Sequence, residues 1–364
     1  MILNRYILNE IIVPMVIILT VLVSIFASYS TMHYLEDAVY GFMPVPTVIS
    51  LILLKVIISL EVLLPCTLYL SVIVGIGRLY KDGEITAMFA SGIGLARIVA
   101  IVLVLSFSIA LIVASLSLFV RPWAYERGFL LKEKAKVEFD VTQLKAGRFH
   151  KIGKGNRFIF ISKIDHKQKS AEGVFLQKDK KNERDVIEVI CAKKARQSHG
   201  RSSNGQDILF LDGYVYELSR TRKGDWKVTK FDQLTIPLWP KEIKTKEYKV
   251  KAASTIHLSR SKAPSDIAEL QWRYSTPLST ILLALLGIPL SRTTPRKGKY
   301  SKVAFAMLIY ASYYGLSAMA KIFVVQEAMP ALPGVWWVQV LLGGLLFVLL
   351  IHPSQQFWPR MGRH

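Results

Sequence analysis

The chain has 364 residues, of which 52% are hydrophobic, and it carries a formal net charge of +21. Its apolar residues gather in runs of about 20, the length that crosses the hydrocarbon core of a bilayer as a helix, so a purely water-soluble protein is excluded. A strongly basic chain fits nucleic acid, an anionic membrane or an anionic substrate, and the apolar runs count against nucleic acid as a partner.

Six apolar runs are predicted to be transmembrane helices, three before and three after a polar central block. They are about Ile11–Met32, Val48–Gly77, Ile98–Val120, Thr276–Leu290, Val303–Val325 and Val335–Ile351. The fourth run is short, and Ile267, Leu270 and Trp272 extend it toward its start. The first run is too long for a cleaved signal peptide, and no small-residue cleavage site follows it.

The loop between the second and third runs contains a short amphipathic pattern. Glu84, Ile85, Met88 and Phe89 have helical spacing between flanking glycines, which predicts a helix at about residues 82–92. One interpretation is a solvated connector. The other is a coupling helix whose Ile85, Met88 and Phe89 face enters a groove on a partner, while Glu84 pairs with a cation there.

The central block, Arg121–Leu270, begins with a helical extension, Arg121–Phe139, and then changes to alternating patterns. Strands are predicted at Arg157–Ile164, Gly173–Gln177, Val186–Ala192, Ile208–Leu218 and Trp226–Ile236, with turn residues between them. Regularly spaced short strands indicate an antiparallel β sandwich or jellyroll. The block holds 33 Lys and Arg against 19 Asp and Glu. The last part of the block, Lys241–Ser265, is polar and is expected to return the chain to the membrane.

The short loops fix an orientation, because an excess of Lys and Arg stays on the cytoplasmic side. Positive charges occupy the N-terminus, the loop after the second run, the loop after the fourth run and the C-terminal tail. The opposite short loops, His33–Thr47 and Gln326–Gly334, contain no Lys or Arg. Both termini are therefore expected in the cytoplasm and the central block on the other side.

Charged residues in the membrane runs are candidate ligand contacts, since an intramembrane charge usually faces a cavity or a partner. Lys55 and Lys321 lie near the outer ends of the second and fifth runs, and His33 follows the first. Snorkelling of the lysines to the interface is one interpretation. The other is contact between their ammonium groups and the phosphate of an anionic lipid. Glu61 is a possible counterion for Lys55, although six residues is not a same-face spacing.

No motif for catalysis or for a resident cofactor is found. The closest approach to a phosphate-binding loop, Gly147–Gly155, has the wrong spacing and lacks the Ser or Thr after its Lys. The seven histidines are scattered without metal-ligand spacing. The two cysteines, Cys66 in an apolar run and Cys191 in the central block, predict no disulfide framework. The chain alone is therefore not expected to be an enzyme or to bind a metal.

Four stretches resemble a known family, and they occur in the same order along the chain. They are NRYILNE near the start, GRLYKDGEITAMFASGIG at Gly77–Gly94, AELQWR at Ala268–Arg273, and IPLS followed by TPRKGK. Together they resemble the LptF/LptG permeases, the transmembrane subunits of the ATP-driven lipopolysaccharide exporter of Gram-negative bacteria. The stretches GRFHK and FIFISKID resemble the LptF branch more than the LptG branch.

The resemblance implies an α-helical inner-membrane protein of six transmembrane helices with an inserted all-β periplasmic jellyroll-like domain. Its parts would be residues 1–120, 121–270 and 271–364. It implies a complex with an LptG-like permease, a dimer of LptB-like ATPases and an LptC-like partner, and lipopolysaccharide as substrate. ATP and Mg would be bound by the ATPase, with no cofactor in this chain.

The resemblance also implies roles for individual residues. Glu84 falls at the position that contacts the ATPase through the coupling helix, and Lys321 matches a family lysine that faces the lipid cavity. At the outer end of the first run, relatives often carry Lys or Arg where this chain has Ser30 and His33. The rival hypotheses are the paralogous LptG subunit and a membrane-anchored binding or scaffold protein without transport.

Overall fold

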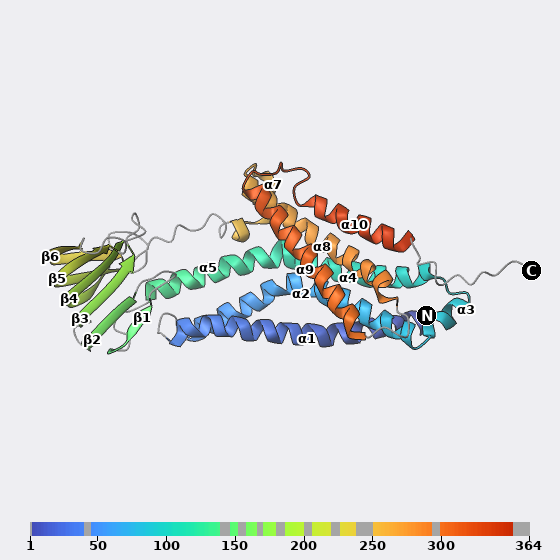
Figure 1. The fold of residues 1–364 in the computed structure, drawn as a ribbon, viewed down its shortest axis with the longest axis horizontal. Helices are drawn as coiled ribbons and strands as arrows, with labels where there is room; N and C mark the ends of the chain where they lie inside the picture. The colour runs from blue at the N-terminus through green and yellow to red at the C-terminus, as the bar shows by residue number, and fades with distance from the viewer. Residues whose placement is uncertain are drawn as a thin grey trace, which may run out of the picture. The chain divides into compact units, whose positions relative to one another are not determined.

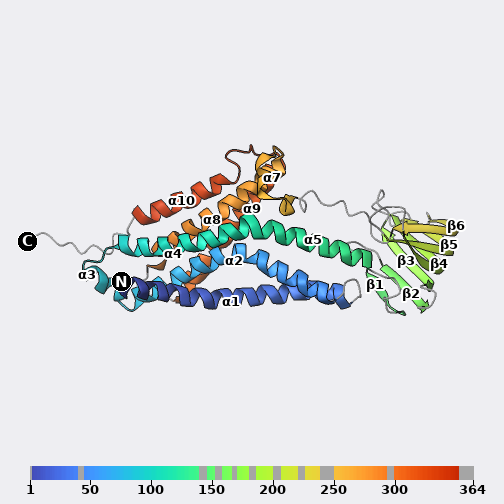
Figure 2. The same cartoon turned by 180° about the vertical axis from the view of Figure 1, so that it is seen from behind.

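The computed structural model of the chain is drawn from two sides in Figures 1 and 2. It describes residues 2–39, 45–138, 146–151, 158–165, 170–179, 186–199, 206–219, 226–237, 250–292 and 299–351. The chain divides into two compact units. The first comprises Met1–Ser30, Leu53–Arg127 and Lys246–His364, and the second comprises Thr31–Ile52 and Gly128–Thr245.

The helices follow the apolar runs closely. They are α1 (Ile2–Val39), α2 (Val45–Lys81), α3 (Glu84–Ala90), α4 (Leu95–Ser115), η1 (Leu116–Val120), α5 (Arg121–Glu138), α7 (Thr255–Arg260), α8 (Pro264–Ser291), α9 (Lys299–Val325) and α10 (Trp336–Ile351). In the described part of the chain, five helical stretches are long and apolar enough to cross a membrane, and α10 is a shorter apolar helix. The chain is therefore an α-helical membrane protein, and its fourth apolar run does begin earlier, at Pro264.

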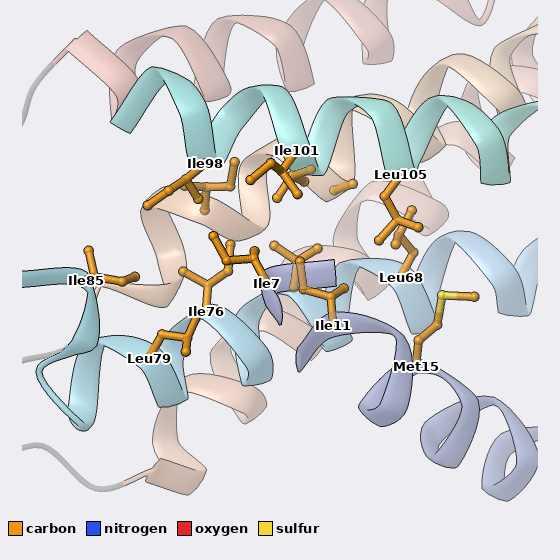
Figure 3. Packing of buried hydrophobic residues seen from close by; sticks show 14 of the residues in the cluster. Ile7, Ile11, Met15, Leu68, Ile76, Leu79, Ile85, Ile98, Ile101 and Leu105 are labelled. Carbon is orange, nitrogen blue, oxygen red and sulfur yellow. The ribbon is translucent and has the colours of Figure 1, made fainter. Parts of the chain in front are cut away.

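The first unit has an apolar core where the start of α1, the end of α2, α3 and the start of α4 meet. Figure 3 shows this packing, in which Ile7 and Ile11 lie among side chains such as Ile76, Ile85 and Ile98. Helices α1 and α2 come very close there, because a Cβ atom added at Gly75 would lie 2.4 Å from the carbonyl oxygen of Glu10. A residue without a side chain is required for this approach.

A second apolar cluster joins α2 to α8, α9 and α10. Tyr69, Leu283 and Leu342 are buried in it, on α2, α8 and α10 respectively. Helix α8 also passes close to α2 at Gly287, where an added Cβ would lie 2.9 Å from Val72. The two halves of the membrane sequence are therefore packed together as one bundle.

The third membrane run contains a wide turn that the sequence pattern did not reveal. The chain passes from α4 into α5 through the π-helix η1, Leu116–Val120. A π-helical turn carries one residue more than an α-helical turn and leaves backbone groups open to other partners. The residues after it, from Arg121 onward, are therefore turned relative to the face that the α4 pattern predicts.

The central block forms an antiparallel sheet in the second unit, as the alternating patterns predict. Its strands are β1 (Phe149–Lys151), β2 (Phe158–Asp165), β3 (Ser170–Asp179), β4 (Val186–His199), β5 (Gln206–Ser219) and β6 (Trp226–Pro237). Each strand pairs with the next, in the order β1-β2-β3-β4-β5-β6. The predicted strands are confirmed, with β1 as an addition and β4 longer than expected. The described strands form a single sheet.

The buried face of this sheet changes phase along one row. Within β2, β3, β4 and β6 the apolar residues of the core follow a period of two, interrupted once by a step of three, as from Ile161 to Ile164 in β2 and from Ala192 to Ala195 in β4. In β5 the same step leads from Phe210 to the buried Gly213. The regular cross-strand pairing is interrupted at the same row, at Ser162, Gly173, Lys193, Asp212 and Asp232. Gly173 (φ 61°) and Asp212 (φ 50°) adopt left-handed backbone there, which disturbs strand geometry.

The opposite face of the sheet is also rich in apolar side chains. Phe160, Phe175, Cys191 and Tyr214 stand in register across β2 to β5. The Phe149 ring of β1 continues this row, with its centroid 4.9 Å from that of Phe160. Phe149, Tyr214, Leu218, Trp226 and Val228 are all exposed. One face of the sheet thus forms the core of the second unit, and the other presents aromatic surface.

Candidate functional site

Five charged side chains from four helices meet inside the first unit, and we call them the ion network: Glu61, Arg121, Glu269, Arg273 and Lys321. Arg121 contacts Glu61 at 2.7 Å and Glu269 at 3.1 Å. Glu269 also bonds to Arg273 at 3.3 Å and to the Lys321 ammonium group. Glu269 therefore holds three cations at once.

Local sequence explains part of this arrangement. Glu269 and Arg273 are four residues apart on α8, so they lie on the same helix face. Lys321 is near the end of α9, and its ammonium nitrogen lies 5.2 Å from the centre of the Trp272 ring of α8, within the range of a cation–π contact. Arg121 is the first residue after the π-helix, whose extra residue helps to determine where the guanidinium points.

Hydrogen bonds join the ion network to the π-helix. The Ser117 hydroxyl of η1 donates to Glu61 Oε1 at 2.9 Å. Arg273 Nη1 donates to the Thr255 hydroxyl at 3.0 Å, and that hydroxyl donates to the Leu118 carbonyl at 2.7 Å. Arg273 Nη2 also donates to the carbonyls of Lys251 and Ala253. The wide turn and the segment leading into α8 are thus fixed to the same charges.

Burial makes these charges dependent on one another. The side chains of Arg121, Glu61, Glu269 and Arg273 are at most 7% exposed, whereas that of Lys321 is 19% exposed. Charges removed from water are tolerated only when they are paired and hydrogen-bonded. Three cations face two carboxylates, so the ion network has a formal surplus of one positive charge, and Lys321 is its most accessible member.

A small cavity lies beside the ion network. Its volume is about 20 Å³, and its wall includes Glu61, Pro65, Trp272, Tyr310 and Ser317. That volume has room for about one water molecule. Among the described residues, the buried Ser317 hydroxyl has no hydrogen-bond partner. The cavity is therefore a small, mainly apolar pocket at the edge of the charges, too small for a lipid group without movement of the helices.

The two predicted lysines both come close to the ion network. Lys55 of α2 is half-buried, and its ammonium nitrogen lies 5.9 Å from the centre of the Tyr125 ring, the same ring that the Arg121 guanidinium faces at 5.9 Å. Lys321 is itself a member. The carboxylate of Glu61 is held by Arg121 and Ser117, two contacts that were not predicted from the sequence.

His33, the third candidate, belongs to the second unit. It is exposed, and its ring meets the Tyr34 ring edge-on at 5.4 Å between centroids. Tyr34 is buried and also faces the Lys132 ammonium group at 5.4 Å. The His33 imidazole and the Lys132 ammonium group thus both contact the Tyr34 ring.

The predicted short helix is confirmed as α3, but its apolar face points toward the core of the chain itself and not toward a partner. Ile85 is fully buried in the core of the first unit (Figure 3). Met88 packs into the same core and is 8% exposed. The expectation that these two residues enter a groove on a partner is therefore wrong. Phe89 is 43% exposed, and Glu84 accepts a hydrogen bond from the Tyr6 hydroxyl at 3.0 Å.

Sequence reasoning missed three members of the ion network. Arg121 was identified only as the first residue of the helical extension, and Glu269 and Arg273 were noted only within the AELQWR stretch. Their spacing of four residues in an apolar helix was the available signal, since a charged pair at that spacing indicates a shared face. In the described residues, no group of three or more His, Cys, Asp and Glu side chains is placed to hold a metal ion.

These features define a polytopic α-helical membrane protein with an inserted β sheet and a buried ion network. The chain belongs to the family of lipopolysaccharide export system permeases LptF/LptG, whose model matches residues 5–352. The lipopolysaccharide export system permease protein LptF of Escherichia coli K12 is 25% identical over 321 residues, covering 88% of this chain and 87% of that protein. The protein of the same name in Shigella flexneri matches equally. The resemblance, with its closer similarity to the LptF branch, is confirmed.

Proposed function

We propose that this chain is the LptF-type permease subunit of an ATP-driven exporter that takes lipopolysaccharide from the inner membrane toward the outer membrane. The observation that carries the proposal is the family match over residues 5–352, in a chain whose helices and sheet have the expected order. The relatives named as lipopolysaccharide export system permease proteins LptF support this choice over the paralogous LptG.

The proposal includes a topology. The helices α1, α2, α4, α8, α9 and α10 would be six spans of the inner membrane, with both termini in the cytoplasm and the β sheet in the periplasm. The absence of Lys and Arg from His33–Thr47 and Gln326–Gly334 supports this orientation. The six-stranded sheet would be the described part of a jellyroll, a fold of antiparallel strands in two sheets.

The proposal also includes partners. The sequence contains no phosphate-binding loop, so ATP and Mg would be bound by a dimer of LptB-like ATPases, with no cofactor in this chain. An LptG-like permease and an LptC-like protein would complete the complex. Helix α3 would transmit the movement of the ATPase. Its contact would be made by Glu84 and the exposed Phe89, while Ile85 and Met88 would anchor the helix to the membrane core.

Lipopolysaccharide offers phosphates and acyl chains, and the chain has a surface suited to each. Lys321 and Lys55 would meet the phosphates, since an ammonium group binds phosphate as a point charge, and His33 would contribute to this contact. The exposed aromatic face of the sheet, with Phe149, Tyr214 and Trp226, would shield acyl chains from water after they leave the membrane.

Co-purification and crosslinking test the proposal. A tagged chain that is expressed together with its proposed partner proteins should retain an ATPase subunit on purification. A photo-crosslinker at Phe89 should attach to that subunit. A crosslinker at Lys321 should capture lipopolysaccharide more than one at Val340, an exposed apolar position on α10. Purification without any nucleotide-binding subunit, in conditions that keep the chain folded, would favour the scaffold hypothesis instead.

A further inference from the structure

We propose that Glu269 is the internal counterion of Lys321, and that a phosphate group arriving at Lys321 displaces it. On this proposal Glu269 is a positioning residue that sets how tightly the site holds its anion and how readily the anion leaves. The inference rests on the proposed function, because it takes the contact between Lys321 and a lipid phosphate as given.

The first support is the unequal accessibility of the three cations around Glu269. The side chains of Arg121 and Arg273 are 7% and 0% exposed, against 19% for Lys321. An incoming anion therefore meets the ammonium group first. The Trp272 ring lies 5.2 Å from the same nitrogen and remains a contact when the carboxylate is exchanged.

The second support is that Glu269 keeps partners when Lys321 is withdrawn. Its Oε1 atom remains 3.1 Å from Arg121 and 3.3 Å from Arg273. A buried carboxylate left without any cation would be strongly disfavoured, but one that retains two is still compensated. The bond between Glu269 and Lys321 is thus the member of the ion network that can open without isolating a charge.

The third support is the charge of the whole cluster. Three cations and two carboxylates leave one formal positive charge, so one further anionic charge brings the cluster to neutrality. An ammonium group has three donors, which lets Lys321 turn from the carboxylate to a phosphate oxygen without leaving its place on α9. Glu269 then lowers the affinity for the phosphate by competition and assists its release.

Glu269→Gln in the purified complex tests this role. The substitution removes the competing charge, so binding of radiolabelled lipid A that carries both phosphates should tighten by about three- to tenfold, the effect of one neighbouring charge. Lipid A stripped of its phosphates should bind the variant and the parent equally. Added inorganic phosphate should compete with the phosphorylated lipid if any phosphate serves, and should not compete if the site requires the whole headgroup.

Two further variants make the result specific. Lys321→Met should weaken binding of the phosphorylated lipid, and Glu269→Gln combined with Lys321→Met should bind no more tightly than Lys321→Met alone. Glu172→Gln is the matched control, because it removes the same charge from an exposed pair with Lys194 on the sheet and should leave lipid binding unchanged. A purely structural role for Glu269 would not make the gain depend on Lys321.

The outcomes are separable. If Lys321→Met weakens binding and Glu269→Gln in an assembled complex leaves it equal or weaker, the counterion role is wrong and the phosphate contact stands. If Lys321→Met has no effect on binding, the phosphate contact itself is wrong and the counterion role is overturned with it. Should Glu269→Gln prevent assembly, Glu269→Asp keeps the charge and shortens the side chain, and a smaller rise in affinity is expected.

Discussion

Charged side chains pair in both units of this protein, but their surroundings differ. In the sheet, Lys193 and Asp212 lie 2.6 Å apart with side chains that are 78% and 51% exposed. In the helices of the first unit, Arg121 and Glu61 lie 2.7 Å apart with side chains that are 7% and 3% exposed. The two distances are nearly equal, yet the first pair is exposed to bulk water, which screens it, and the second pair is buried. Distance alone is therefore a poor guide to what a pair contributes.

The largest effect is expected where a partner is removed from the ion network. Arg121→Leu leaves Glu61 and Glu269 with one cation fewer in a buried site, which should cost about 3–5 kcal/mol. Thermal unfolding of the detergent-purified protein should show a large drop in midpoint. Lys193→Leu, on the sheet, is the control and should change the midpoint little. Equal losses for the two variants would contradict the contrast between the units.

The second-largest loss of stability is expected from a backbone clash in the first unit. Gly75→Ala places a Cβ atom 2.4 Å from the carbonyl oxygen of Glu10, and the nearest atoms belong to the backbone of α1, which can yield only by moving the helix. A loss of about 3 kcal/mol is expected, at the upper end of the range for overpacking. Gly94→Ala is the comparison, because no atom of the described part of the chain lies within 4 Å of its added Cβ.

A smaller loss of stability is expected from a substitution in the row of the sheet where the buried face changes phase, which we call the phase-change row. Gly173→Ala combines left-handed backbone with a Cβ atom 2.6 Å from the Ser162 hydroxyl. The conformational part alone should cost about 1–2 kcal/mol. Protease resistance of the sheet in urea, measured on the full chain, should fall accordingly. Ser162→Ala combined with Gly173→Ala removes the hydroxyl and should recover part of the loss. No recovery would mean that the loss comes from the backbone conformation and from the Ser162 Cβ atom, which lies 2.9 Å from the added Cβ and stays in both variants.

The smallest effect is expected from the exposed pair, and it depends on pH. The Lys193 ammonium group lowers the pKa of the Asp212 carboxyl, and the carboxylate raises the pKa of Lys193. The stabilisation is therefore present between the unfolded pKa values, about 4 and 10, and is lost below and above them. Asp212→Asn should lower the urea midpoint slightly at pH 7 and not at pH 2. A difference that persists at pH 2 would mean that the pair is not its cause.

Much of the fold could be predicted from the sequence, because apolar runs and alternating strands are local patterns. The inward direction of Ile85 and Met88 could not. Their spacing defines a helix face, but it does not say whether that face meets the chain's own helices or a partner. The ion network was hidden for a related reason: its members lie on four helices far apart in the sequence, and only Glu269 and Arg273 share a helix.

The phase change of the sheet was also hidden, since the stretch Phe158–Ile164 reads as simple alternation until burial shows the step from Ile161 to Ile164. The π-helix was missed because one extra residue inside a continuous apolar run leaves the composition of that run unchanged. Both features shift a pattern by a single residue, and a shift of that size is below what periodicity over a short window resolves.

The phase-change row has a consequence for how the sheet avoids mispairing. In an ordinary antiparallel sheet, a strand that slips by two residues keeps its apolar side chains on the core face and can go undetected. Here each strand from β2 to β6 carries its irregular position at one fixed place, so a slip by two would set an irregular residue beside a regular one. Only one alignment of the strands places all five irregular positions in the same row, so the row fixes the register of the sheet.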